Sequence, residues 1–440
     1  MTERAATKNQ WLLGLSTFAL VGIAVSAVKL ALAMTAFTPQ AQPTGYVAQI
    51  AMSNLNLVGG AETAYLPEYE QEFWSGNLYA YPVNAAGEVN TAAERWTDGA
   101  RDNITAQNFD TGRLIATMRD DGAKVPFRSA NLSAAQQTSL ATTVNSTPYS
   151  SLQIVDFLRG DRSNESIGGL RVRAWALGDI MHSRPYYVAD ATTPTIFVGA
   201  NDGMLHAINA ADGSERWAYV PSMLIPTLKN LAANPYAAAN HTYYVDGQIN
   251  VANVANVTIG IASNRVLVGG LGAGGKGLYA LDITTMDATT EGDVTNKALW
   301  EISPTQILYN NAKTTSTSYA NLGFTYGSSA IAKVRTGGGG IQDAVIIGNG
   351  YNNGGDFQAY LYVINAANGQ LIRAIKADTA LTTDGTAASP NGIFTAVAVN
   401  SDADAYNVAD QAYAGDLNGT MWKFNLSGLP ANWRDRKSVV

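Results

Sequence analysis

Residues 195–220 read T-I-F-V-G-A-N-D-G-M-L-H-A-I-N-A-A-D-G-S-E-R-W-A-Y-V, a pattern that predicts three short strands joined by two turns. Asp202-Gly203 and Asp212-Gly213 lie between apolar runs, where a tight hairpin needs residues that tolerate a positive φ. The third run contains Trp217, which is large enough to fill the space between neighbouring sheets. One such meander cannot bury both of its faces alone, so the sequence should contain further copies.

Copies of the middle strand recur along the chain, at residues 76–81, 203–208, 277–281, 359–364 and 419–424. Four of them are preceded by a short apolar run that ends in glycine, at Gly199, Gly269, Gly348 and Gly415. Several are followed by a small-residue turn and then by a tryptophan, at Trp96, Trp217, Trp300 or Trp433.

The last four copies recur about every 60 to 80 residues, which exceeds the roughly 40 to 50 residues of an ordinary propeller blade. The repeats therefore predict an all-β chain, a modified β-propeller with quinoprotein-like blades, long inserted loops and a few short helices. No strand follows Trp433 before the last residue, Val440, so we expect the propeller to be incomplete at its C-terminus.

Composition excludes several classes of function. The 440 residues carry a formal net charge of −7 with 14% charged residues and no basic stripe, which argues against nucleic-acid binding. The absence of cysteine excludes a disulfide framework, a thiol nucleophile, cysteine-ligated zinc and a lipid-anchored lipoprotein.

The N-terminus predicts export. Arg4 and Lys8 precede an apolar run at residues 11–28, and Ala31-Leu32-Ala33 forms a cleavage site of the A-x-A type. We expect residues 1–33 to be a signal peptide cleaved after Ala33, and the mature chain to have no contact with a membrane. The apolar run is long for a signal peptide, so a retained N-terminal anchor is the alternative.

The sequence thus predicts three segments: a signal peptide or anchor at 1–33, a lead-in at 34–72 and a propeller at 73–440. The propeller is expected to contain a helical insertion at about 128–165. The sequence S-A-A-Q at residues 133–136 is a capping box that predicts a helix through about Val144. Residues 220–231 predict a locally helical loop, and residues 288–295 predict a polar loop.

The sharpest chemical feature is a calcium-loop pattern near the C-terminus. Asp402, Asp404 and Asp410 lie at positions 1, 3 and 9 of an EF-hand-type loop. Tyr406 and Val408 lie at positions 5 and 7, where a backbone carbonyl can serve as a ligand. Calcium prefers six to eight hard oxygen ligands, so this spacing predicts a Ca²⁺ site.

The calcium pattern has departures. Asn407 replaces the usual glycine at position 6 but tolerates a left-handed turn better than most residues. Tyr406 stands where a third carboxylate is usual, and Tyr413 stands where the bidentate glutamate would be, so weak affinity is expected. The alternative is an ordinary polar loop before a strand.

Other motifs carry less information. Arg159-Gly160-Asp161 is an integrin-type tripeptide for which a solvated turn is the simpler interpretation. His182, His206 and His241 are too widely separated for a metal site or triad to be evident, and His206 is expected to be a hydrogen-bonded core histidine. No catalytic signature is present, and the glycine-rich residues 271–277 join two predicted strands as a flexible hairpin loop.

Several segments together resemble one known family, the PilC/PilY type IV pilus biogenesis factors and tip adhesins. They are residues 178–185, 198–207, 218–222, 244–247, 267–277, 323–327, 347–351 and 413–419. The resemblance covers roughly residues 73–434, in order. It implies a modified propeller with a calcium loop just before a Y-A-G-D-L strand, and it maps Asp402, Asp404 and Asp410 onto that loop's carboxylate ligands.

The resemblance also implies a role. Members of the family support pilus extension against retraction, with calcium as a switch, and so serve twitching motility and adhesion to surfaces or host cells. The expected partners are major and minor pilins of the pilus tip complex and a surface or host-cell ligand. The expected location is the periplasm, the outer surface or the pilus tip (fimbrium), and the chain is expected not to be an enzyme.

Two alternative functions belong to other classes of propeller protein. Similar repeats occur in quinoprotein dehydrogenases, but these need a quinone pocket with calcium and a catalytic aspartate, and no such cluster is evident here. Propeller scaffolds of outer-membrane protein assembly are usually lipoproteins, which the missing cysteine opposes. The adhesive part of the inference is weaker, because no D-x-S-x-S motif is present and the N-terminal part is short.

Overall fold

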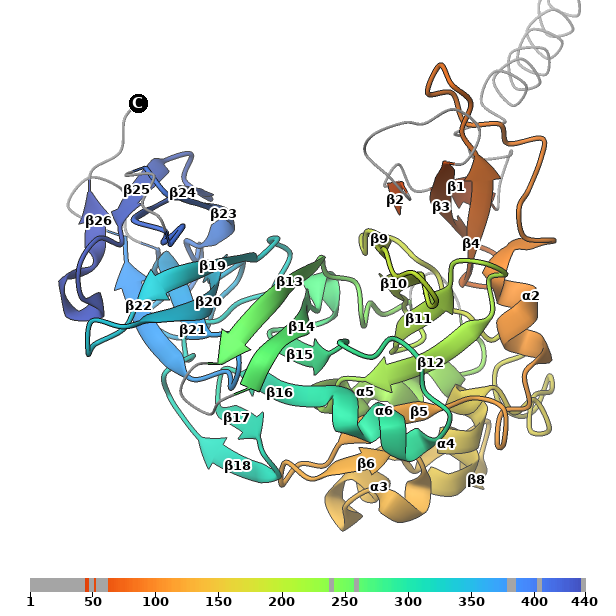
Figure 1. Cartoon of the computed structure of the whole chain (residues 1–440). Coiled ribbons are helices and arrows are strands. Elements are labelled where there is room, and N and C mark those ends of the chain that lie inside the picture. Colours follow the sequence, from red (N-terminus) through yellow and green to blue (C-terminus); the bar gives the residue numbers. More distant parts are fainter. Residues whose placement is uncertain are drawn as a thin grey trace, which may run out of the picture.

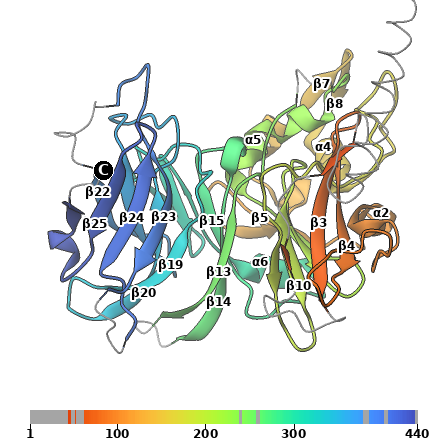
Figure 2. The same ribbon diagram turned by 90° about the horizontal axis from the view of Figure 1, so that it is seen from above.

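The computed structural model describes residues 44–46, 51–52, 62–236, 241–256, 261–377, 385–401 and 406–436. In this part of the chain the strands form five large sheets that follow one another along an open arc (Figure 1). The first and fifth sheets lie at the two ends of the arc, with the third sheet between them (Figure 2). These are the blades of an unclosed propeller, so the predicted fold class is confirmed.

The five sheets have the following strands. The first contains β1 (Thr44–Tyr46), β2 (Ala51–Met52), β3 (Thr63–Glu70) and β4 (Ser75–Pro82). The second contains β5 (Ile115–Met118), β6 (Lys124–Pro126), β9 (Tyr186–Val188), β10 (Thr195–Gly199), β11 (Leu205–Asn209) and β12 (Glu215–Val220). The third contains β13 (Ile249–Asn256), β14 (Ile261–Gly270), β15 (Leu278–Asp282), β16 (Ala298–Ser303), β17 (Gln306–Tyr309) and β18 (Ala312–Thr315).

The last two sheets have four strands each. The fourth contains β19 (Ala330–Arg335), β20 (Ile341–Gly348), β21 (Tyr360–Asn365) and β22 (Leu371–Lys376), and the fifth contains β23 (Ile393–Val399), β24 (Gln411–Asp416), β25 (Met421–Asn425) and β26 (Arg434–Arg436). The helices are α2 (Gly99–Ala106), α3 (Ala134–Leu140), α4 (Ser151–Arg159), α5 (Ile225–Leu228) and α6 (Glu291–Lys297). A separate hairpin is formed by β7 (Thr142–Val144) and β8 (Thr147–Tyr149).

Residues 195–220 form the antiparallel meander β10–β11–β12, as predicted. Gly203 and Gly213 have φ of 95° and 78°, the left-handed values that their turns require. The predicted middle-strand copies lie on β4, β11, β15, β21 and β25.

Tryptophan side chains join neighbouring sheets. The indole nitrogen of Trp217 donates to the carbonyl of Met286 (2.7 Å), and that of Trp300 donates to the carbonyl of Ala366 (2.8 Å), in each case beyond the middle strand of the next sheet. Trp96 makes the corresponding bond to Ala210 (3.3 Å) from a loop. Trp433 bonds the carbonyl of Gly428 in its own sheet, so it does not repeat this arrangement. The expectation that no strand follows Trp433 is wrong, because β26 begins at the next residue and pairs with β25.

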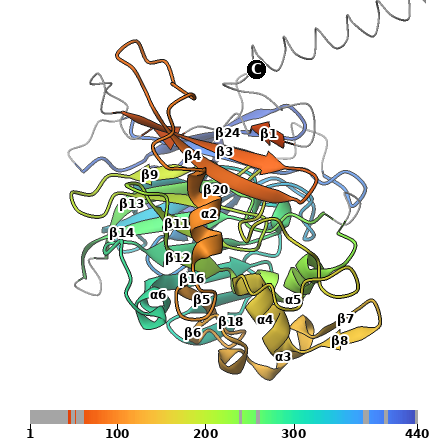
Figure 3. The same ribbon diagram turned by 90° about the vertical axis from the view of Figure 1, so that its right-hand side faces the viewer.

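The insertion between the first and second sheets is partly helical. The capping box at Ser133 opens α3 as predicted, but the helix ends at Leu140, because the positive φ of Asn145 (47°) and Ser146 (67°) turns the next residues into the hairpin β7–β8. Helix α3 contacts α4 and α5, and these helices gather on one side of the molecule (Figure 3). The expected polar loop at 288–295 is wrong, because Thr290 caps α6 there.

The expected lead-in at 34–72 overlaps the first sheet. Strand β3 falls within that range and pairs along its whole length with β4. The signal peptide or anchor expected at residues 1–33 lies outside the described residues. Within the described residues, no helix has the length and apolar character that crossing a bilayer requires.

Two of the recurring glycines, Gly199 at the end of β10 and Gly348 at the end of β20, lie where the backbone that enters the next sheet passes close by. A Cβ atom at Gly199 would lie 2.2 Å from the carbonyl oxygen of Val245, and one at Gly348 would lie 2.3 Å from that of Ile393. The glycine-rich segment after β14 is packed in the same way, with a Cβ at Gly274 falling 1.8 Å from the carbonyl oxygen of Tyr244. This segment is therefore a close backbone crossing rather than a flexible loop.

Alanine at Gly348 is expected to destabilise the protein by roughly 2 kcal/mol or more, since the methyl group must displace backbone atoms. Gly415 offers a matched control, because it ends the corresponding strand of the fifth sheet and no described atom lies within 4 Å of its Cβ position. We expect Gly415→Ala to change the free energy of unfolding, measured in urea, by less than about 0.5 kcal/mol. Equal losses for the two variants would contradict this explanation of the repeated glycine.

Candidate functional site

The predicted calcium loop lies between β23 and β24 of the fifth sheet. Asp402 and Asp404 lie outside the described residues, so the structure says nothing of them. Tyr406 is 68% exposed, whereas Val408 is buried. Asn407 has a φ of 53°, the left-handed turn expected at position 6 of the loop.

Asp410 closes the loop. Its carboxylate accepts a hydrogen bond from the Ser401 backbone N–H (2.7 Å) and another from the Ser401 hydroxyl. Burial opposes ionisation, but these bonds outweigh it and hold the pKa of Asp410 below its ordinary value. The described part of the loop thus has an ionised carboxylate and the tight turn that an oxygen-donor site for calcium needs. Among the described residues, no three His, Cys, Asp or Glu side chains cluster as metal ligands.

The loop is tied to the fourth sheet. Val408 forms a parallel bridge with Lys333 on β19, and the N–H of Ala409 donates to the Lys333 carbonyl (2.8 Å). The Lys333 ammonium pairs with Asp343 on β20 (3.1 Å), whose other carboxylate oxygen accepts from the Ala255 N–H on β13 (2.7 Å). A change in the loop can therefore reach two neighbouring sheets.

The sequence did not predict that all three histidines pair with acidic residues. His182 Nδ1 lies 2.7 Å from Asp246, and His241 Nε2 lies 3.0 Å from Asp179. Asp179 and Asp246 occur shortly before β9 and β13, where the chain enters two successive sheets. An aspartate that recurs shortly before a strand could have indicated these pairs in the sequence. Both aspartates, however, lie outside the strands on which the repeats were aligned.

His206 belongs to a buried network of four charged groups. Its Nδ1 lies 2.7 Å from Glu215 and its Nε2 lies 3.1 Å from Asp202, while Glu215 pairs through both oxygens with Arg113 (2.7 and 2.8 Å). His206 is fully buried, as expected for a hydrogen-bonded core histidine. Burial opposes its charged form, but Asp202 and Glu215 raise the pKa of His206 to about 9.

The raised pKa makes stability depend on pH. A histidine with a folded pKa above its unfolded value of 6.5 stabilises the fold fully below pH 6.5 and loses that contribution as the pH rises to about 9. The loss is expected to be roughly 3 kcal/mol. Urea unfolding between pH 6 and 9.5 should show this decline, and the His206→Gln variant should lack it. A wild-type free energy that stays constant over the range would contradict the prediction.

The integrin-type tripeptide is not displayed for binding. Arg159 is fully buried and donates to the carbonyls of Phe109 (3.1 Å), Phe127 (3.1 Å) and Arg113 (2.9 Å). Its guanidinium also pairs with Glu291 (2.9 Å). Arg159 therefore holds the helical insertion against the second sheet.

Comparison with known proteins decides the family. A family model described as the PilY1 beta-propeller domain matches residues 177–437. The chain belongs to the PilY1 family. Similar relatives are the type IV pilus biogenesis factor PilY1 of Pseudomonas aeruginosa, 32% identical over 400 residues, which cover 82% of this chain and 30% of the relative, and a PilY1 homolog of Xylella fastidiosa, 29% identical over 464 residues, which cover 92% and 30%.

The chain thus spans about 30% of the length of these curated PilY1 relatives. Among solved structures, the crystal structure of the Pseudomonas aeruginosa PilY1 C-terminal domain is 30% identical, with a TM-score of 0.40, over 56% of this chain and 44% of that chain. The PilY1 match begins just before β9 and ends beside β26, so it contains the calcium-loop pattern and all three histidine–acid pairs.

Proposed function

We propose that this chain acts in type IV pilus biogenesis as a non-enzymatic, calcium-binding propeller. The observation that carries the proposal is its membership of the PilY1 family, whose curated relatives are named type IV pilus biogenesis factors. In this role the exported chain supports pilus extension against retraction at the pilus tip or cell surface. Its partners are pilins of the tip complex, and adhesion uses a surface or host-cell ligand.

Calcium acts in this proposal as the switch. The carboxylates of Asp402, Asp404 and Asp410 and the backbone carbonyls of Tyr406 and Val408 supply hard oxygen ligands. Binding draws the acidic loop together, and the connection of Val408 to β19 carries the change to the fourth sheet. The surface presented to pilins then differs between the calcium-bound and calcium-free states.

The test is complementation of a piliated strain that lacks this gene, with surface pili counted in calcium-replete and chelated medium. We expect the wild-type gene to restore pili and the Asp402→Ala/Asp410→Ala variant to restore markedly fewer. Calorimetry on the purified proteins should show at least about tenfold weaker calcium binding by the variant, because two charged ligands are lost.

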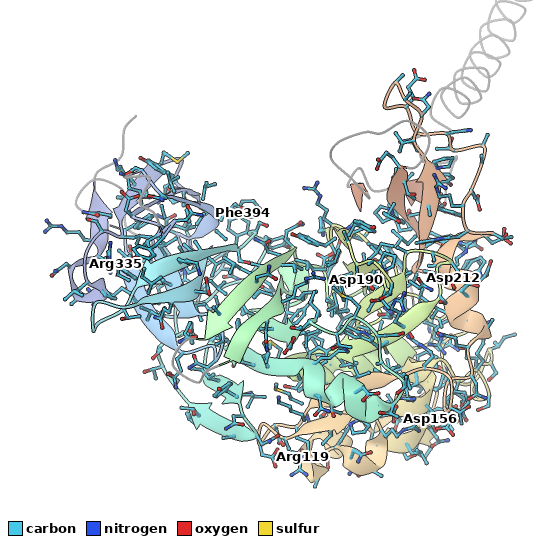
Figure 4. The ribbon with its side chains drawn as sticks, in the orientation of Figure 1. Arg119, Asp156, Asp190, Asp212, Arg335 and Phe394 are labelled. Atoms are coloured by element: carbon cyan, nitrogen blue, oxygen red, sulfur yellow. The ribbon has the colours of Figure 1, made fainter. Side chains whose placement is uncertain are left out.

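Asp212→Ala is the matched control. Asp212 is an exposed aspartate in a turn of the second sheet, which the third and fourth sheets separate from the fifth sheet (Figure 4). Unchanged calcium affinity in the double variant would contradict the proposed calcium site but not the proposed role in pilus biogenesis. Failure of the wild-type gene to restore pili would contradict the function.

A further inference from the structure

Three oxygen-bearing side chains gather on one face of the first sheet. Strands β3 and β4 pair in a register that sets Glu70 opposite Ser75 and Glu68 opposite Asn77, close to the turn that joins the two strands. Directly opposite residues project from the same face of an antiparallel pair, and so do residues two apart on one strand. Glu68, Glu70 and Ser75 therefore share a face, and we call them the first-sheet oxygen cluster.

Each member of the first-sheet oxygen cluster has an oxygen atom that is shielded from water and left without a partner. Glu68 is 6% exposed and Ser75 is 2% exposed, while the Glu70 side chain is 17% exposed. The atoms Glu68 Oε2, Glu70 Oε2 and Ser75 Oγ are themselves buried, and they make no hydrogen bond to any described residue. Buried polar atoms are nearly always hydrogen-bonded, so three exceptions on one face require an explanation, such as a bound ion.

Ser75 points to a ligand independently of the two carboxylates. A serine hydroxyl can rotate and can both donate and accept, so a buried one normally finds a partner. The Ser75 hydroxyl lies across the strands from Glu70 but does not donate to it. Lone pairs of both groups are therefore available to one ion between them.

The Arg101 guanidinium offsets the negative charge of the cluster only in part. Its Nη1 lies 3.7 Å from Glu70 Oε2, which is too far for a hydrogen bond, and the guanidinium is stacked on Trp175, 3.6 Å from the ring centre. Burial is the main cause that raises the pKa of Glu68 to about 7, and the charge of Glu70 raises it further. An ionised Glu68 is therefore costly unless a second positive charge comes close.

Calcium is the cation that suits these ligands. Carboxylate and hydroxyl oxygens are hard donors, which favour Ca²⁺, Mg²⁺ or Mn²⁺ over softer metals. Opposite residues have Cβ atoms roughly 5 Å apart, and residues two apart on a strand are separated by roughly 7 Å. This uneven spacing suits calcium, whose coordination is flexible, whereas magnesium needs a nearly ideal octahedron. Three protein ligands leave positions for water, so a Kd of about 10⁻⁴ to 10⁻³ M is expected.

We propose that Glu68, Glu70 and Ser75 bind a calcium ion on the first sheet. The two carboxylates supply the negative charge, and the serine hydroxyl supplies a neutral oxygen from the neighbouring strand, so the ion joins β3 to β4. This site lies in a different sheet from the predicted calcium loop. It depends neither on that loop nor on the proposed role in pilus biogenesis.

The experiment titrates the full chain carrying Asp402→Ala/Asp410→Ala with calcium chloride and follows the heat. This background removes the carboxylates of the predicted calcium loop, so the remaining binding reports the first sheet. We expect one calcium ion to bind per chain. Terbium, which replaces calcium and emits when a nearby aromatic ring is excited, should become luminescent, because Tyr79 and Tyr81 share the face of β4 that carries Ser75.

Three variants in this background test the ligands. Glu68→Gln/Glu70→Gln keeps the side-chain shapes but removes both charges, so it should weaken calcium binding at least about tenfold. Ser75→Ala removes one neutral ligand and should weaken binding about three- to tenfold. Glu88→Gln is the matched control, because Glu88 is an exposed carboxylate after β4 whose side chain bonds Asn84. It should bind calcium within about twofold of the background chain.

Circular dichroism identifies any variant that fails to fold. Glu70→Gln alone, which changes the more exposed of the two carboxylates, keeps the test decisive if the double glutamine variant is one of them, and it should weaken binding at least about fivefold. The proposal is overturned if the background chain binds no calcium, if the glutamine variants bind it as the background chain does, or if Glu88→Gln weakens binding as much as they do.

Discussion

Replacing Glu215 by alanine should destabilise the protein by about 3–5 kcal/mol, the range observed when one partner of a buried ion pair is removed. The side chains of Glu215 and Arg113 are each 1% exposed, and the carboxylate also accepts from His206. Burial opposes ionisation, but Arg113 and His206 hold the pKa of Glu215 far below its ordinary value, so the lost group is a charged one. Without it, the Arg113 guanidinium remains buried without its counter-ion. The free energy of unfolding in urea measures the loss.

Two further variants sharpen this test. Glu88→Ala removes an exposed carboxylate that bonds only locally to Asn84, and it should change stability by less than about 0.5 kcal/mol. The double replacement Arg113→Met/Glu215→Leu removes both charges, so it should cost less than Glu215→Ala alone. If Glu215→Ala unfolds like wild type, the network does not stabilise the fold in the way its geometry indicates.

The fold was predictable because its signals are local and repeated. The turn glycines, the alternation within β10–β12 and the copies of β11 can each be recognised from a few adjacent residues. The structural reason for glycine at positions 199 and 348 could not be recognised in this way, because Gly199 and Gly348 each contact a distant segment that enters the next sheet. The sequence showed that glycine recurs, and only the structure showed the close approach that requires it.

The charged networks escaped prediction for the same reason. Arg113 and Glu215 are 102 residues apart in sequence, and His241 and Asp179 are 62 apart. No spacing rule connects such residues before the sheets are placed. Local rules also have exceptions, because the capping box at Ser133 was recognised while that at Thr290, which has aspartate at its third helical position, was missed.

The candidate calcium loop was predictable only in part. The left-handed turn at Asn407 follows from local sequence preferences. The bridge from Val408 to Lys333 does not, because it depends on how the fourth and fifth sheets pack. This bridge gives the loop a physical route to the rest of the propeller, whereas the metal ligation by Asp402 and Asp404 remains a prediction.

Truncation of Trp300 to alanine should also cost about 3–5 kcal/mol, because it removes a fully buried indole between two sheets. The indole packs beneath the turn at Gly369, where a Cβ atom would lie 3.0 Å from the ring, and its N–H bonds the carbonyl of Ala366. Loss of the ring leaves a cavity and an unsatisfied carbonyl at the junction of the third and fourth sheets.

Trp175→Ala is the matched control for this variant. Trp175 is partly exposed, stacks beneath Arg101 with the guanidinium 3.6 Å from the ring centre, and donates to Asp102 (2.6 Å). Its loss should cost only about 1–2 kcal/mol, since water can replace both contacts. Urea unfolding of the two variants compares them directly. Because the fourth sheet has the exposed Arg373 at the position that Trp300 holds in the third, a small effect of Trp300→Ala would mean that packing of aliphatic side chains alone can join successive sheets.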